Sequence, residues 1–501
     1  MRANGILMHI SSLPSDYGIG TLGNEAKRFV DFLKKAGQTY WQVLPICPTG
    51  FGDSPYQSFS SYAGNPYFID FDILRDKGLL SEAEYANIIW SESYDIVDYE
   101  TLYFNRYIVL KKAFDRFDYK SDAQYGEFCR KNAFWLDDYA LFMALKNKYN
   151  GASFDTWPDD IKLRKPDVLE SEKVALAEPI EFEKVMQFWF FEQWFEIKNY
   201  ANENGIKIIG DIPIYVSKDS ADLWSDPVQF DVTEDFTPRE VAGVPPDEFT
   251  ADGQLWGNPL YNWKYMQKDN YSWWCRRIEH ASTIYDVIRI DHFRGFDSYY
   301  CVPFTDTNAK NGVWRKGPGM KLFNAISAKL GALPIIAEDL GYLTASVHRL
   351  LKNSGFPGMK VMQFAFDPEK DSEYLPHNYN EKCVVYTGTH DNDTILGWFS
   401  TAEKEQTEFA KEYLRLNDTE GYNWGMIKSA MASKAMLCII TMQDLIALGS
   451  EGRMNTPAKL GGNWQWRIGK ECINDWLACI MYKQTKIYKR LPQAESIAED
   501  E

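Results

Sequence analysis

The chain has 501 residues, 45% hydrophobic and 15% aromatic, and can therefore bury a large core. This length fits roughly two to four ordinary domains or one elaborated α/β barrel. The chain has 54 basic and 71 acidic residues, so its net charge is −17. No run of Lys or Arg is long enough to follow a phosphate backbone. Nucleic acid and anionic membranes are therefore excluded as expected partners.

The N-terminus and the cysteines favour a cytoplasmic location. The stretch GILMHI after Arg2 is too short for a signal-peptide core, and no apolar run elsewhere reaches membrane length. The eight cysteines are scattered, with no C-x-x-C pair and no His at zinc spacing. This pattern is typical of reduced thiols in the cytosol, and we expect no metal site.

Eight short apolar runs end in polar or glycine-rich turns, and stretches of helical periodicity such as 23–37 and 321–332 lie between several of them. The runs are GILMHISSLPS (5–15), TYWQVLPICP (39–48), IKIIGDIPIYV (206–216), YDVIRIDHFRG (285–295), LPIIAEDLG (333–341), MKVMQFAFD (359–367), KCVVYTGTHDND (382–393) and MLCIITMQDLIAL (436–448). Strands that alternate with helices predict a parallel sheet, and eight such units predict a (β/α)8 TIM barrel.

Two gaps between the runs are too long for one helix each. Residues from about 70 to 200 are rich in aromatics and charges, which predicts an inserted helical subdomain. Residues from about 217 to 280 include VAGVPPDEFTADGQLWGNPLYNW (241–263), and we interpret them as a long ordered active-site loop. We therefore expect one catalytic barrel domain over 1–501, with both insertions leaving from the carboxyl ends of strands.

Four carboxylates follow predicted strands at their carboxyl ends: Asp211, Asp291, Glu338 and Asp391. Each one alone could simply cap the helix that follows. In a closed barrel, however, all four would meet on one rim, and their joint placement indicates a functional site.

Carboxylates on one rim allow two chemistries: Mg²⁺ or Ca²⁺ binding, or retaining glycoside chemistry by a carboxylate and a carboxylic acid about 5 Å apart. Arg289 favours the second. It precedes Asp291 by two residues on the same strand, so both side chains share one face and the guanidinium can hold the carboxylate ionised. Glu338 follows apolar Ile336 and Ala337, which suits a raised pKa and the work of a general acid.

Aromatic residues on the expected loops indicate that the site binds sugars. Tyr56, Trp256 and Tyr261 stand among Gly, Pro, Ser, Gln and Asn, where flat rings can stack on pyranoses and polar groups can bond hydroxyls.

At these residues the sequence resembles a known family. RIDHFRG, AEDLG and GTHDNDT, with GDSPYQSFSSYAGNPY, GDIPIYV and GVPPDEF, are similar to the motifs of glycoside hydrolase family 77, the 4-α-glucanotransferases or amylomaltases. The resemblance runs from SSLPSDYGIGTLG near the N-terminus to RMNTPAKLGGNWQWR (453–467), and so covers nearly the whole chain.

The resemblance implies a role for several residues. Asp291 would be the nucleophile with Arg289 as its support, Glu338 the general acid/base, and Asp391, beside His390, the transition-state stabiliser. The remaining candidate substrate-binding residues are Tyr56, Ser54, Asp211, Trp256, Phe249, Asp367 and Asn455.

The expected function is transfer of an α-1,4-glucan segment to glucose or to another α-1,4-glucan, with retention of configuration and without any cofactor. An α-amylase-like hydrolase and a non-catalytic glucan-binding protein are the alternatives. The sequence leaves the oligomeric state open, a homodimer included, as well as the preferred chain lengths and the formation of cyclic products.

Overall fold

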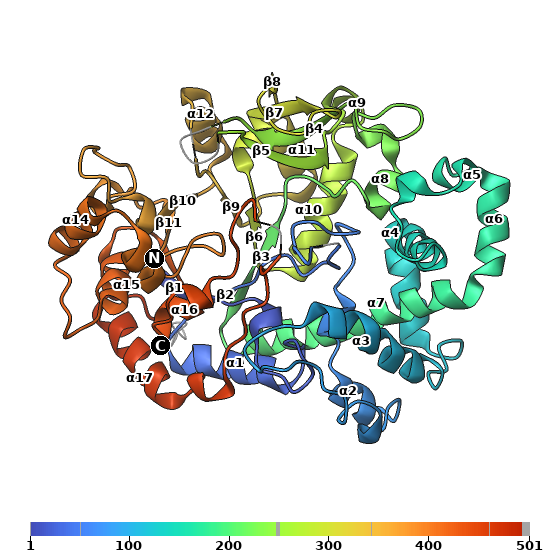
Figure 1. Ribbon diagram of the computed structural model, residues 1–501, viewed down its shortest axis with the longest axis horizontal. Helices are drawn as coiled ribbons and strands as arrows, with labels where there is room; N and C mark the ends of the chain where they lie inside the picture. Colours follow the sequence, from blue (N-terminus) through green and yellow to red (C-terminus); the bar gives the residue numbers. More distant parts are fainter. Residues whose placement is uncertain (1, 51, 247–250, 342, 460, 493–501) are drawn as a thin grey trace, which may run out of the picture.

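Eight parallel strands form the central sheet of the computed structural model, which describes residues 2–50, 52–246, 251–341, 343–459 and 461–492 (Figure 1). The strands are β1 (Ala3–Leu7), β2 (Tyr40–Gln42), β3 (Lys207–Ile212), β6 (Val287–Ile290), β9 (Ile335–Ala337), β10 (Gly358–Val361), β11 (Cys383–Tyr386) and β12 (Leu437–Thr441). Each strand overlaps one of the eight apolar runs. The runs are mostly apolar because these strands are buried on both faces, against the helices and against the barrel interior.

The sheet is nearly closed into a barrel. Its order is β10-β11-β12-β1-β2-β3-β6-β9, and all neighbours are parallel. At the seam between β9 and β10, the Ala337 amide donates to the Pro357 carbonyl at 3.0 Å. The (β/α)8 barrel predicted from the alternation of strands and helices is therefore confirmed.

Helices cover the outside of this barrel. They include α1 (Asn24–Lys35), α10 (Ser272–Ile284), α11 (Met320–Leu330), α12 (Ala345–Ser354), α13 (Ile395–Thr401), α14 (Lys404–Leu414), α15 (Tyr422–Ala432), α16 (Met442–Leu445) and α17 (Asp475–Ile487). In α1 the buried residues Phe29, Val30 and Leu33 recur at helical spacing, so that one face packs on the sheet.

A group of helices occupies much of the first insertion and lies to one side of the barrel (Figure 1). It comprises α2 (Phe71–Asp76), α3 (Tyr99–Phe114), α4 (Ala123–Lys148), α5 (Asp159–Lys162), α6 (Pro166–Ala175) and α7 (Ala177–Glu203). Buried Gln187 of α7 accepts from the Gly64 amide at 2.7 Å and donates to the Gly64 carbonyl at 2.9 Å. These bonds anchor the segment that follows Tyr56, so the inserted helices help to fix one wall of the barrel mouth.

The second insertion is not the long loop that we expected. It contains α8 (Ala221–Ser225), β4 (Glu240–Val244), β5 (Gln254–Pro259) and α9 (Trp263–Lys268), and it ends within α10. Strands β4 and β5 join β7 (Ser298–Pro303) and β8 (Val313–Lys316) in an antiparallel sheet of order β5-β4-β7-β8. Gly and Pro weaken the strand pattern of β4 and β5, and β7, the second partner of β4, lies far along the chain.

No helix in the described ranges is both long and apolar enough to cross a membrane.

Candidate active site

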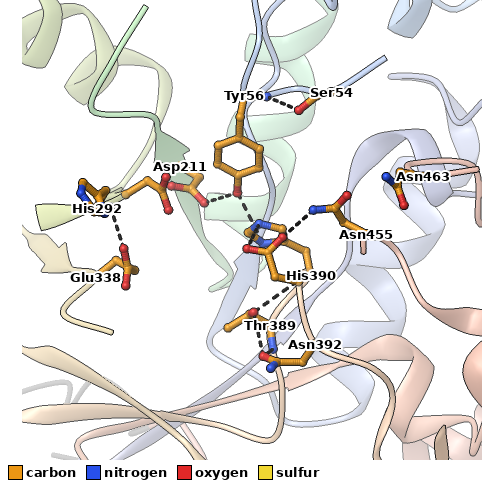
Figure 2. Close-up of polar contacts among 12 residues, drawn as sticks. Ser54, Tyr56, Asp211, His292, Glu338, Thr389, His390, Asn392, Asn455 and Asn463 are labelled. Atoms are coloured by element: carbon orange, nitrogen blue, oxygen red, sulfur yellow. Dashed lines mark hydrogen bonds and ion pairs between the residues drawn. The ribbon is translucent and has the colours of Figure 1, made fainter. Parts of the chain in front are cut away.

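Three carboxylates stand where β3, β6 and β9 end, and a fourth lies in the loop after β11. Asp211 is the second-to-last residue of β3, while Asp291 and Glu338 directly follow β6 and β9. Asp391 lies beyond β11 in a turn closed by Asn392, whose side chain accepts from the amide and the hydroxyl of Thr389 at 2.9 Å each (Figure 2).

A buried guanidinium joins two of these carboxylates. The β3–β6 register sets Asp211 opposite Arg289, and their side chains form an ion pair. The second Arg289 nitrogen, Nη2, lies 3.0 Å from Asp291 Oδ1, as the two-residue spacing predicts. The side chains of Arg289 and Asp211 are 4% and 0% exposed, whereas that of Asp291 is 28% exposed. Asp291 is therefore the one of the three that a ligand can reach.

Glu338 is held by backbone amides. Its Oε2 accepts from the His292 amide at 2.7 Å (Figure 2). Its Oε1 accepts from the Leu340 amide, also at 2.7 Å. His292 adopts a left-handed conformation with φ 52°, which turns the chain immediately after Asp291. The same turn therefore places Asp291 and carries the amide that binds Glu338.

Burial perturbs the pKa of both carboxyls. It raises the pKa of Glu338 to about 7, and the negative charge of Asp291 adds to this effect, while Arg289 and the two backbone amides oppose it. Burial also raises the pKa of Asp291 to about 6, against the attraction of Arg289. Near neutral pH the proton of this pair therefore resides on Glu338 and the negative charge on Asp291.

Tyr56 and His390 connect this pair to Asp391. The Tyr56 hydroxyl donates to Asp211 Oδ2 at 2.8 Å, and its ring stacks on His390 with centroids 4.9 Å apart (Figure 2). His390 Nε2 lies 3.3 Å from Asp391 Oδ2, and Asn455 Nδ2 donates to Asp391 Oδ1 at 2.6 Å.

These partners outweigh the effect of burial on Asp391. Burial alone would raise its pKa, but the charge of His390 and the hydrogen bonds from His390 and Asn455 lower the pKa of Asp391 to about 2. Asp391 is thus a permanent anion, and the pKa of His390 is raised in return, because Asp391 outweighs the effect of its burial.

The other predicted site residues differ in whether they contact the carboxylate cluster and its neighbours. Ser54 Oγ accepts from the Tyr56 amide at 3.3 Å and so shapes the turn that carries Tyr56 (Figure 2). Trp256 lies in β5 with its ring 4.8 Å from the His292 ring. Asp367 pairs with Lys370 at 2.9 Å, and among the described residues no hydrogen bond or ion pair joins it to the carboxylate cluster. Phe249 lies outside the described residues.

Tyr261 is not an exposed loop aromatic, as we expected. It is buried, and its hydroxyl donates to the Ile214 carbonyl at 2.6 Å. The Gly- and Pro-rich sequence around Tyr261 resembles a loop, but the ring fills a core between β3 and α10.

Two further residues belong to the site. His292 positions Glu338, and Trp464 places its ring 5.9 Å from Tyr56 and 5.8 Å from His390. Both stand inside motifs, RIDHFRG and GGNWQWR, that carry the family resemblance. The two motifs therefore pointed to these residues, but the spacing of the motifs alone did not indicate what either side chain does.

A (β/α)8 barrel whose strand ends hold an ionised and a protonated carboxyl side by side has the architecture of a retaining carbohydrate-active enzyme. The family model Glyco_hydro_77, described as 4-alpha-glucanotransferase, matches residues 8–471. The chain therefore belongs to the 4-alpha-glucanotransferases of glycoside hydrolase family 77.

Individual relatives agree with this assignment. The chain is 50% identical over 485 residues to the 4-alpha-glucanotransferase of Clostridium butyricum, covering 96% of this chain and 100% of that one. It is 45% identical over 480 residues to that of Thermus thermophilus, covering 93% and 95%. The solved amylomaltase of Streptococcus agalactiae in complex with acarbose superposes with a TM-score of 0.96 at 43% identity, covering 98% and 100%.

Proposed function

We propose that this 4-alpha-glucanotransferase moves a segment of an α-1,4-glucan onto the 4-hydroxyl of glucose or of another α-1,4-glucan, with Asp291 as nucleophile and Glu338 as acid/base. The observation that carries this proposal is the pair of carboxyls at the ends of neighbouring strands, one paired with Arg289 and the other buried and held by backbone amides, with its pKa raised to about 7. The donor and the acceptor are α-glucans, and we expect the reaction to need no metal or organic cofactor.

In the first half-reaction, Glu338 donates its proton to the oxygen of the scissile linkage. The Asp291 carboxylate attacks the anomeric carbon as the bond from that carbon to the leaving 4-oxygen breaks. The products are a β-linked glycosyl ester of Asp291 and a free fragment that carries the new 4-hydroxyl.

In the second half-reaction, Glu338 is ionised and takes the proton of the acceptor 4-hydroxyl. The acceptor oxygen attacks the anomeric carbon, the ester bond breaks, and Asp291 leaves as a carboxylate. Two inversions restore the α configuration, and Glu338 is protonated for the next cycle.

The surrounding polar groups support these steps. Asp391 carries a fixed negative charge that can accept hydrogen bonds from the sugar at the cleavage point and stabilise positive charge at its anomeric carbon. Asp211 and Tyr56 are positioning residues, since Asp211 orients Arg289 and Tyr56 bonds Asp211. Trp256, next to His292, offers an aromatic surface on the acceptor side of Glu338.

Hydrolysis is the competing outcome, because water can replace the acceptor hydroxyl in the second half-reaction. A site that excludes water and stacks an acceptor sugar favours transfer. Trp256, which contacts His292 and is partly exposed, can supply such a surface, while buried Trp464 packs against His390 and Tyr56 and supports the wall of the site. We further propose that the enzyme works in the cytoplasm, in keeping with its eight unpaired cysteines.

The test is incubation with maltotriose alone, with products resolved by size over time. Glucose together with maltopentaose and longer chains is the expected result, because each transfer lengthens one molecule while it shortens another. Glucose and maltose without longer products would establish a hydrolase instead. Maltotriose that is bound but left intact would indicate a glucan-binding protein.

A further inference from the structure

A pocket of about 350 Å³ lies beside the site and has no part in the steps above. This volume is at the lower end of the range for small-molecule sites, roughly 300–1,000 Å³. We refer to it as the Trp314 pocket, and its lining includes Arg294, Asp297, Ser298, Trp314, Thr344 and Ser346. It is formed between the antiparallel sheet and α12, which lie close together in Figure 1.

The aromatic wall of this pocket is an exposed but fixed indole ring. Arg294 stacks on Trp314, with its guanidinium carbon 4.1 Å from the ring centroid. Tyr300 of β7 contacts Trp314 edge-on at 5.2 Å and is itself held by a 2.9 Å hydrogen bond to the Ala309 carbonyl. Trp314 nevertheless remains 44% exposed, so part of the indole faces solvent in a set orientation. Such a ring presents a flat apolar surface at little further entropic cost on binding.

The opposite wall is polar. Asp297 Oδ2 accepts from Ser346 Oγ at 2.7 Å and from Ser298 Oγ at 3.3 Å. Thr344 Oγ1 lies 2.9 Å from Ser346 Oγ. Asp297 Oδ1 accepts no hydrogen bond from any residue that the structure describes, so it can accept one from a ligand.

This combination suits a ligand with several hydroxyl groups. Three basic residues, Arg294, Arg315 and Lys316, line the pocket and supply hydrogen-bond donors, although Arg315 is already paired with Glu240 at 2.8 Å. Asp297 supplies an acceptor. An aromatic surface together with these donors, a carboxylate and hydroxyl groups is suited to a pyranose, which offers one apolar face and several hydroxyls.

The walls of the pocket are built by the two segments that hold Glu338. Arg294 and Asp297 belong to the turn after Asp291, whose His292 amide bonds Glu338 Oε2 and whose Phe293 amide bonds the Glu338 carbonyl at 3.0 Å. Thr344 and Ser346 follow Glu338 along the chain, and the Asp297–Ser346 hydrogen bond joins the two segments. Part of the pocket lining is therefore carried by the same two segments that hold Glu338 in place.

We propose that the Trp314 pocket binds a distal glucose unit of the acceptor chain, with Trp314 as its stacking platform, and so makes longer acceptors preferred. This inference rests on the proposed function. The acceptor presents its non-reducing 4-hydroxyl to Glu338, and its remaining units extend away toward the reducing end. A unit beyond those next to Glu338 contacts Trp314 and donates a hydroxyl to Asp297.

The experiment measures acceptor kcat/KM for radiolabelled glucose, maltose, maltotetraose and maltohexaose with an amylose donor, in wild-type enzyme and in Trp314→Ala, Trp314→Phe and Trp476→Ala. Trp476 on α17 is 70% exposed and serves as a matched control for loss of a surface tryptophan. In Trp314→Ala the ratio of maltohexaose to glucose efficiency falls about five- to tenfold, the loss expected for one aromatic contact. In Trp314→Phe the ratio falls by less than in Trp314→Ala, and in Trp476→Ala it equals the wild-type ratio.

Two results would overturn the inference: an unchanged ratio in Trp314→Ala, or an equal loss with glucose and with maltohexaose in Trp314→Ala and Trp314→Phe. The proposed function fails separately, if the wild-type enzyme extends none of the labelled acceptors. If the Trp314→Ala enzyme still transfers glucan and keeps the wild-type ratio of maltohexaose to glucose efficiency, the role of the Trp314 pocket is refuted and the proposed function stands.

Discussion

Replacement of Asp211 by Asn tests whether the buried charge network sets the protonation of the nucleophile. The wild-type enzyme should give a bell-shaped profile of kcat/KM, because Asp291 must be ionised and Glu338 protonated. From the pKa values of about 6 for Asp291 and about 7 for Glu338, the profile should rise near pH 6 and fall near pH 7.

The Asp211→Asn change acts on the rising limb. The charge of Asp211 raises the pKa of Asp291, and Asp211 also shares Arg289 with it. Without that charge Arg289 attracts Asp291 alone, so the pKa of Asp291 falls and the rising limb moves to about pH 5. The amide oxygen of Asn can still accept from Tyr56, but one partner of a buried ion pair is lost. The free energy of unfolding should therefore fall by about 3 kcal/mol, the lower end for such a loss.

The assay is initial-rate kinetics with maltotriose from pH 4 to 9, together with thermal unfolding of each variant. Asp475→Asn is the control, since Asp475 is 80% exposed and pairs with Lys35 at the surface. It should leave both limbs in place, because exposed ion pairs contribute little. A rising limb that stays near pH 6 in Asp211→Asn, or moves to higher pH, would refute the assigned network.

Three further variants separate the roles in the site. Asp291→Asn should lower transfer from maltotriose by about 10⁴-fold or more in an enzyme that still unfolds cooperatively, and a smaller loss would exclude Asp291 as nucleophile. Glu338→Gln should lose transfer from maltotriose yet form a glycosyl-enzyme from α-maltotriosyl fluoride, because fluoride needs no proton to leave; mass spectrometry that detected no adduct would count against Glu338 as the acid. Asn455→Ala removes the 2.6 Å bond to Asp391 and should lower kcat about 10- to 100-fold, measured at saturating maltotriose; an unchanged kcat would show that Asp391 needs no such support.

The barrel could be predicted because its strands are apolar on both faces. A run such as KIIGDI in β3 needs no partner to be recognised, and the polar residue at its end marks the rim. Asp211, Asp291 and Glu338 therefore followed from position along the chain, and the Arg289–Asp291 ion pair from strand alternation.

The antiparallel sheet could not be predicted in the same way. Strand β4 is short and contains Gly243, and it is stabilised by β7, which begins more than fifty residues later at Ser298. The Trp314 pocket depends on this sheet, so its lining was equally hidden. Contacts of His292 and Trp464 depend on left-handed turns at both residues, which no local pattern specified.

The distribution of cations explains why Glu338 has a higher pKa than the rim carboxyls Asp291 and Asp391. Four carboxylates so close together would repel one another if all were ionised. Arg289 forms ion pairs with two of them, Asp211 and Asp291, and His390 pairs with Asp391. Within the described residues no cationic side chain contacts Glu338, whose hydrogen-bond donors are the amides of His292 and Leu340. The proposed acid role of Glu338 therefore follows from where the positive charges lie, since a cation beside it would lower its pKa and favour its ionised form.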